Sequence, residues 1–94
     1  MPVYVIGRIH VRDPARWQEY VSQVGETISR HGGEVQFRGE QSRIFAGDDA
    51  AERVVVIKFA DADAAERWHD SSDYQRLVAV RDAAADVTLV SYQA

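Results

Sequence analysis

The run of residues 53–59, RVVVIKF, constrains the fold of this chain more than any other part of its sequence. Three successive valines and an isoleucine favour extended backbone, and they leave no polar face that could lie in water. We therefore expect a strand that is buried on both sides in the middle of a sheet. Because 94 residues leave room for only one domain, residues 1–94, the neighbouring strands must come from the same small unit.

Three other stretches are rich in β-branched and aromatic residues, and they predict strands at 3–11, 34–39 and 86–92. Residues 43–47, RIFAG, look like the start of the next strand, with a loop at 47–51 before the run at 53–59. This pattern predicts four strands in total, so one sheet can contain the whole strand content of the chain.

Two helices are expected between these strands. Asp13-Pro14 opens the first, because an Asp side chain caps free N–H groups and Pro is favoured in the first turn. His31-Gly32-Gly33 ends it, with Gly33 as the expected left-handed cap. The second helix begins at a capping box, residues 63–66, and Ser71-Ser72-Asp73 interrupts it and can cap another helical piece.

The resulting order is β-α-β-β-α-β, which predicts an α+β, ferredoxin-like domain with a four-stranded antiparallel sheet. Both helices would cover one face of that sheet and leave the other face bare. A second copy of the chain is the simplest cover for an apolar sheet face. We therefore expect a homodimer in which two sheets pair as a dimeric α/β barrel.

Composition argues against several classes of protein. The net charge is −4 and Lys58 is the single lysine, so no basic stripe favours a nucleic-acid partner. There is no cysteine, and the three histidines lie on separate elements, so neither a disulfide nor a metal site is expected. No phosphate loop or dinucleotide fingerprint is present, and no cofactor is predicted. The first residues resemble a strand rather than a signal peptide, no run is long enough to span a membrane, and the expected location is cytoplasmic.

Taken together, the ordered elements resemble those of the domain-of-unknown-function family thirteen-thirty (DUF1330). The resemblance runs from about residue 3 to residue 92. The residues and segments that carry it are Tyr4, Asp13-Pro14, Tyr20, residues 31–33, Arg38-Gly39, Gly47, residues 53–59, Trp68, residues 72–75 and Arg81.

This resemblance implies the dimeric α/β-barrel superfamily. The superfamily is similar in fold to cofactor-free monooxygenases acting on polyphenols, muconolactone isomerase, haem-degrading enzymes and chlorite dismutase-like proteins. Their chemistries differ, so the shared fold does not identify a reaction. This chain contains no Asn, and it therefore lacks the strand-one Asn that some monooxygenase relatives use.

Several side chains are candidates for a binding site between the helices and the sheet. Aromatic rings could line an apolar pocket, arginines could hold an acidic group, and a histidine at a helix end could carry a proton. The predicted ligand-binding residues are Tyr20, Arg38, Arg53, Trp68, Tyr74 and Arg81, and the candidate catalytic residue is His31.

Each candidate also has a structural explanation. The aromatic residues could simply form the core. Arg81 could form an internal salt bridge, for example with Glu19 or Asp86. His31 could complement the negative end of the first helix.

Two functions therefore remain open. In the first, a homodimer binds a small acidic or phenolic molecule in this pocket, with cofactor-free oxygenation or isomerisation as the reaction class if it is an enzyme. The alternative is a non-catalytic dimeric module with a structural or ligand-sequestering role.

Overall fold

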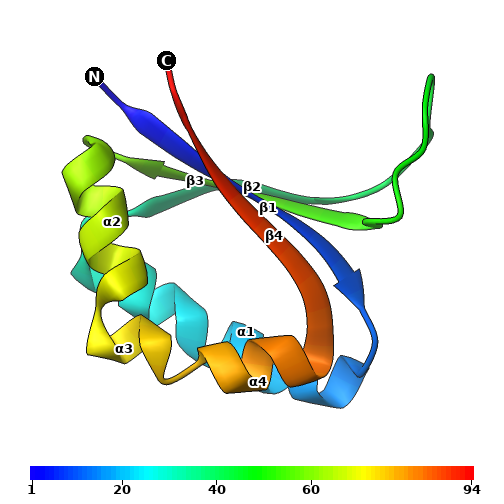
Figure 1. The fold of residues 1–94 in the computed structure, drawn as a ribbon, viewed down its shortest axis with the longest axis horizontal. Coiled ribbons are helices and arrows are strands. Elements are labelled where there is room, and N and C mark those ends of the chain that lie inside the picture. The colour runs from blue at the N-terminus through cyan, green and yellow to red at the C-terminus, as the bar shows by residue number, and fades with distance from the viewer.

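The computed structural model describes residues 1–94 and contains one four-stranded sheet and four helices. In chain order the elements are β1 (Val3–Val11), α1 (Pro14–Arg30), β2 (Glu34–Glu40), β3 (Arg53–Phe59), α2 (Ala62–Asp70), α3 (Ser72–Gln75), α4 (Val78–Ala84) and β4 (Ala85–Gln93). All four helices lie on one side of the sheet, so the molecule has two layers (Figure 1).

The strands follow the order β2-β3-β1-β4, and every neighbouring pair is antiparallel. This order confirms the predicted ferredoxin-like α+β fold. It also places β3 in the interior of the sheet, where its run of valines predicted it. None of the four helices combines the length and the apolar composition that a membrane crossing requires.

The hydrophobic core lies between the sheet and the helices. Side chains alternate between the two faces of a strand, and in β1 the residues that point toward the helices are buried while their neighbours are more exposed. The largest fully buried side chains, Phe59, Trp68 and Tyr74, meet in this layer, with the ring centres of Trp68 and Tyr74 4.5 Å apart. Helices α2 and α3 are therefore held to the sheet by aromatic packing.

Helix α1 has the ends that the sequence predicted, with one correction. Asp13 caps it by accepting a hydrogen bond from the Arg16 N–H. At the other end, Gly32 adopts the left-handed conformation (φ 73°), and the N–H groups of Gly32 and Gly33 bond to the carbonyls of Ser29 and Ile28. The cap glycine is thus Gly32 and not Gly33. Gly33 is constrained by packing instead, because a Cβ there would lie 2.6 Å from Ile28 Cγ2.

Two other local predictions were wrong. Residues 43–47 form no strand, since the whole segment between β2 and β3, residues 41–52, is irregular and Gly47 has a φ of 79°. Helix α2 begins two residues earlier than its capping box suggested, because Asp61 accepts a hydrogen bond from the Ala64 N–H at 2.8 Å. Asp63 lies within the first turn of the helix.

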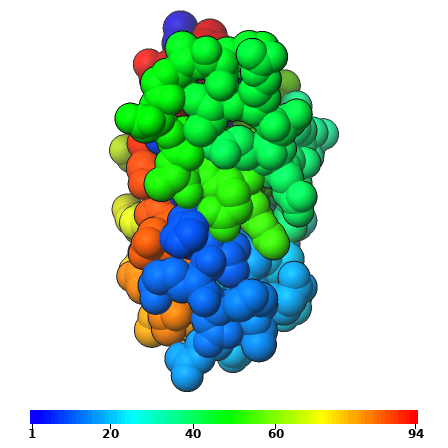
Figure 2. All heavy atoms as spheres, turned by 90° about the vertical axis from the view of Figure 1, so that its right-hand side faces the viewer, coloured from blue at the N-terminus to red at the C-terminus, as the bar shows by residue number.

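The segment 41–52 extends beyond the sheet at one end of the molecule (Figure 1). In the side view of Figure 2 the green atoms that include this segment stand above the start of α1, in blue. Asp49 forms an ion pair with Arg8 of β1, and Glu52 accepts hydrogen bonds from the Val11 N–H and His10, each at 2.8 Å. These contacts attach the segment to β1 despite its lack of regular structure.

The face of the sheet opposite the helices carries an apolar row that crosses all four strands. Phe37 of β2 pairs with Val56 of β3, Val56 pairs with Ile6 of β1, and Ile6 pairs with Val90 of β4. No helix lies on this side of the sheet (Figure 1), and Phe37 and Val90 are 54% and 41% exposed. We call these four residues the outer row.

Candidate functional site

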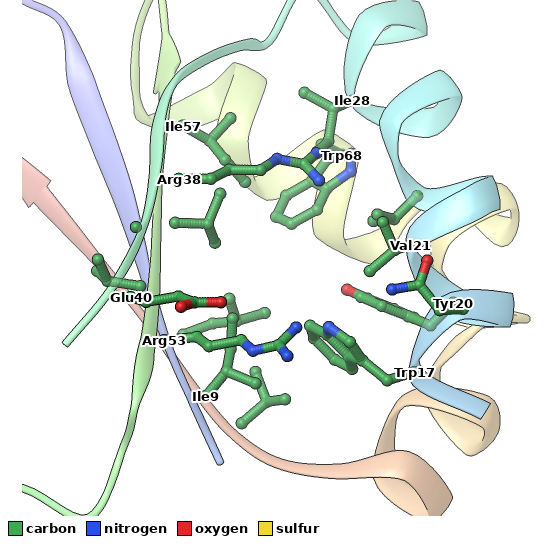
Figure 3. Close-up of a pocket in the computed structure, with 17 residues that line it drawn as sticks. Ile9, Trp17, Tyr20, Val21, Ile28, Arg38, Glu40, Arg53, Ile57 and Trp68 are labelled. Atoms are coloured by element: carbon green, nitrogen blue, oxygen red, sulfur yellow. The ribbon is translucent and has the colours of Figure 1, made fainter. Parts of the chain in front are cut away.

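The candidate site is a cavity of about 410 Å³ between the sheet and helix α1 (Figure 3). Twelve of its seventeen lining residues are hydrophobic, so the walls favour an apolar ligand. Strands β1 and β3 contribute Ile9, Val55 and Ile57, and the rings of Trp17 and Tyr20 on α1 stack with their centres 5.1 Å apart. The cavity is large enough for a small organic molecule.

Three charged side chains also line the cavity, namely Arg38, Glu40 and Arg53. Figure 3 shows all three extending from the sheet toward α1. Neither arginine has a carboxylate within 4.0 Å, and neither donates a side-chain hydrogen bond to the protein. Arg38 is exposed and Arg53 is half-buried, so the positive charge is concentrated where the cavity meets solvent.

Strand pairing explains why the three charges meet. Glu40 of β2 lies opposite Arg53 of β3, and Arg38 lies opposite Val55. Residues two apart in a strand share a face, and residues paired across antiparallel strands do as well. All three side chains must therefore point to the helix side of the sheet, where two positive charges face one negative charge.

Behind the cavity, a chain of hydrogen bonds connects three residues from three helices. The Tyr20 and Tyr74 hydroxyl oxygens are 2.9 Å apart, and Arg81 Nη1 donates to the Tyr74 hydroxyl at 3.0 Å. Tyr74 is fully buried and Tyr20 is 6% exposed. Burial raises the pKa of the Tyr20 hydroxyl far above its usual value, so this phenol stays protonated.

Arg81 is held in place from its other side by Asp82, whose carboxylate accepts from Arg81 Nε at 2.9 Å. Burial lowers the pKa of the guanidinium, but the hydrogen bonds to Asp82 and Tyr74 outweigh this effect and raise it overall. Arg81 forms an internal salt bridge, as its structural explanation predicted, but its partner is neither Glu19 nor Asp86. Asp82 is the partner, and Asp86 pairs with Arg12 instead.

Trp68 reaches the cavity from α2 and is fixed by a polar contact. Its indole Nε1 donates to Thr27 Oγ1 at 3.1 Å, and Thr27 donates in turn to the Val24 carbonyl at 2.7 Å. Thr27 is only 1% exposed, and the sequence reasoning missed it. Its position between Val24 and Ile28 on the apolar stripe of α1 was the available signal, since a hydroxyl on such a stripe needs a buried partner.

His31, the predicted proton carrier, is at the C-terminal end of α1 and does not line the cavity. Its Nδ1 lies 2.9 Å from the Thr27 carbonyl oxygen, which can only accept, so Nδ1 carries the proton. This contact matches the helix-end explanation of His31. Its catalytic role stays a prediction, without a direct route to a ligand in this cavity.

The predicted site residues therefore fall into three groups. Tyr20, Arg38, Arg53 and Trp68 line the cavity together. Tyr74 and Arg81 lie behind Tyr20 and reach it by hydrogen bonds, while His31 stands apart. Glu40 was missed because a carboxylate on an edge strand carries no distinguishing pattern in the sequence. No three His, Cys, Asp or Glu side chains gather closely enough to hold a metal ion.

Several solved structures share this fold. RPA0582, a protein of unknown function from Rhodopseudomonas palustris, has a TM-score of 0.85 at 18% identity, covering 99% of this chain and 82% of its own. A dimeric ferredoxin-like protein of unknown function from Jannaschia sp. CCS1 has a TM-score of 0.81 at 12% identity, with 100% of both chains covered.

SnoaB, a cofactor-independent oxygenase from Streptomyces nogalater, has a TM-score of 0.73 at 17% identity, covering 99% of this chain and 92% of its own. Identities this low establish a common fold and carry no shared activity. No curated protein has a significantly matching sequence. The family model described as "Domain of unknown function (DUF1330)" matches residues 2–93, which is nearly the whole chain, and the protein therefore belongs to the DUF1330 family.

Proposed function

We propose that this protein is a homodimer in which each protomer binds a small apolar carboxylate in the cavity between the sheet and α1. The observation that carries the proposal is the pair of arginines, Arg38 and Arg53, on the wall of a largely hydrophobic cavity without any acidic partner within 4.0 Å. A guanidinium presents several N–H donors in a planar fork that matches a carboxylate. The hydrophobic walls would hold the remainder of such a molecule.

Charge distribution supports an anionic ligand. The chain as a whole carries a net charge of −4, yet the charged residues of the lining are two arginines and one glutamate. A local excess of positive charge in an acidic protein raises the concentration of anions at that place. Because Arg38 is exposed and Arg53 half-buried, a carboxylate between them would keep part of its hydration, which reduces the cost of desolvation.

Both tryptophans of the chain, Trp17 and Trp68, line the cavity, so intrinsic fluorescence reports its occupancy. We expect 4-phenylbutanoate to change this fluorescence saturably and 4-phenylbutanamide, which has the same shape without the charge, to bind at least tenfold more weakly. Arg38→Gln and Arg53→Gln should each weaken binding of the acid about tenfold, the loss expected for one charge-assisted hydrogen bond.

Arg76→Gln is the matched control, because it removes the same charge from an exposed arginine outside the cavity. Equal affinity for the acid and the amide, or equal weakening by all three substitutions, would contradict a carboxylate site. A chain that binds neither compound would favour the non-catalytic structural module.

Isomerisation of a bound carbonyl acid is a second candidate function, and one observation favours it. Glu40 is the only carboxylate on the cavity wall, and it lies opposite Arg53. A carboxylate that faces a bound carbonyl compound can remove a proton from the adjacent carbon. Exchange of these protons for deuterium in 4-oxo-4-phenylbutanoate, followed by NMR in D2O, should be accelerated by the protein and lost in Glu40→Gln. Exchange at the uncatalysed rate would leave binding as the function.

A further inference from the structure

The chain of hydrogen bonds behind the cavity contains three donor groups but only two hydrogen bonds. Arg81 has no acceptor atom, so its Nη1 must donate to the Tyr74 hydroxyl. Each phenol then contributes one O–H, and a single contact of 2.9 Å joins the two oxygens. Three donors thus share two bonds, and one O–H hydrogen has no acceptor among the side chains and carbonyls of the protein.

Burial decides which hydrogen this is. Tyr74 is fully buried and does not line the cavity, and its hydroxyl forms hydrogen bonds only with Tyr20 and Arg81. If Tyr20 donated to Tyr74, the Tyr74 O–H would remain unpaired in the core, and an unpaired buried donor is costly. The favourable arrangement runs from Arg81 to Tyr74 and from Tyr74 to Tyr20. The Tyr20 hydrogen is then left for the cavity, toward which its ring extends from α1 in Figure 3.

Tyr20 and the two arginines occupy different depths of the cavity. Tyr20 is 6% exposed, whereas Arg38 is exposed and Arg53 half-buried. A charged group is more costly to desolvate than a neutral one. A carboxylate therefore fits best near the arginines at the mouth, and a neutral acceptor such as a carbonyl oxygen fits best at the buried Tyr20 hydroxyl, which remains protonated.

We propose that the ligand is an apolar oxo acid, that Tyr20 donates a hydrogen bond to its carbonyl oxygen, and that Tyr74 and Arg81 are positioning residues that direct this donor. The proposal rests on the carboxylate site described above and adds the second polar group of the ligand. It also gives an indirect role to Tyr74 and Arg81, two of the predicted site residues that lie outside the cavity. Arg81 would act through Tyr74 and would not touch the ligand.

The test compares two acids that differ by one group. 4-Oxo-4-phenylbutanoate has a carbonyl where 4-phenylbutanoate has a methylene, and isothermal titration calorimetry gives both dissociation constants. We expect the wild-type protein to bind the oxo acid about tenfold more tightly, which is the upper range for one neutral hydrogen bond. Tyr20→Phe should abolish this preference, so that both acids bind with about equal affinity, while binding of 4-phenylbutanoate changes little.

Tyr74→Phe and Arg81→Gln should also reduce the preference for the oxo acid, because each breaks the chain that directs the Tyr20 donor. A merely structural effect of these changes would weaken both acids alike and leave the ratio unchanged. Arg38→Gln should weaken both acids equally, and it serves as the control for the carboxylate. Circular dichroism checks that each variant is folded, and the wild-type ratio provides a test that needs no variant.

The outcomes separate this inference from the function on which it rests. If both acids bind with equal affinity and both depend on Arg38, the carboxylate site stands and the role of Tyr20 is overturned. If the preference is present but survives Tyr20→Phe, the donor is another group and the inference is again overturned. If neither acid binds, the proposed function and this inference fail together.

Discussion

Charged side chains in this protein differ in whether the chain itself provides their partners. Arg81 contacts Asp82 and Tyr74, and Arg8 and Arg12 pair with carboxylates on other elements. Arg38 and Arg53 have no such partner, although they lie on the wall of a cavity. At the scale of single residues, this contrast distinguishes arginines that stabilise the fold from arginines that are free to bind a ligand.

Glu52 is the residue whose charge state should affect stability most clearly. The Val11 N–H and His10 each donate to its carboxylate, and the pKa of Glu52 is lowered from an ordinary 4.5 to about 2, chiefly by the Val11 backbone bond. A pKa that is lower in the folded state means that Glu52 stabilises the fold fully above pH 4.5. This contribution is lost as the pH falls from about 4.5 to about 2.

We therefore expect the urea midpoint of the wild type to fall over this pH range and Glu52→Gln to have a lower midpoint at pH 7 with a flatter acid dependence. Glu66→Gln, which removes an exposed carboxylate with no hydrogen-bond partner, is the control and should retain the wild-type slope. Identical pH profiles for Glu52→Gln and the wild type would show that the contacts of Glu52 are too solvated to contribute.

At the scale of single elements, one serine fixes the break between helices α2 and α3. Ser71 is the C-cap of α2 and the N-cap of α3. Its Oγ donates to the Trp68 carbonyl at 2.7 Å and accepts from the Tyr74 N–H at 3.2 Å. The same residue therefore positions one aromatic side chain before the break and one after it. The interruption of the helix at this point brings Trp68 to the cavity and Tyr74 to Tyr20.

The start of α2 provides a direct comparison between two candidate caps. Asp61 accepts from the Ala64 N–H, and Asp63 makes no capping contact. We expect Asp61→Ala to destabilise the protein by about 1 kcal/mol, the usual cost of a lost N-cap. Asp63→Ala should cost less, about 0.5 kcal/mol, since it removes only a favourable charge from the first turn. Chemical unfolding measures both, and a larger loss for Asp63→Ala would mean that the helix begins where its capping box suggested.

At the scale of the whole molecule, the two faces of the sheet differ in whether helices cover them. The helices cover one face, and the outer row of Phe37, Val56, Ile6 and Val90 crosses the other. Apolar side chains arranged contiguously on an uncovered face are typical of an interface. We propose that a second copy of the chain covers this face, since a symmetric pair would bring two such rows together.

Dimerisation through the outer row predicts that one charge within it separates the protomers. Val90→Asp places a carboxylate on a side chain that is 41% exposed in the single chain, so the protomer should remain folded. We expect light scattering to give about twice 10.6 kDa for the wild type and 10.6 kDa for this variant at micromolar concentration. Ala79→Asp, on the exposed side of α4, is the control and should remain dimeric. A wild-type chain that is monomeric under these conditions would contradict the dimer.

The sequence by itself determined the order of the elements and the architecture, because these depend on local patterns. Periodic apolar residues, the Asp13 cap and the glycines after His31 marked α1, and the valines of 53–59 identified an interior strand. Local patterns failed where two neighbouring residues could play the same part. Asp61 and Asp63 compete for one cap, and Gly32 and Gly33 for one left-handed position.

Only the tertiary structure decided which candidate site residues act together. Arg38, Glu40 and Arg53 share a wall because β2 and β3 pair in one particular register, and that register depends on a bulge between Val35 and Phe37. The contact of Tyr74 with Tyr20 joins helices α3 and α1, which are distant in sequence. Such contacts depend on distances across the core, and a pattern of residue types along a chain does not encode these distances.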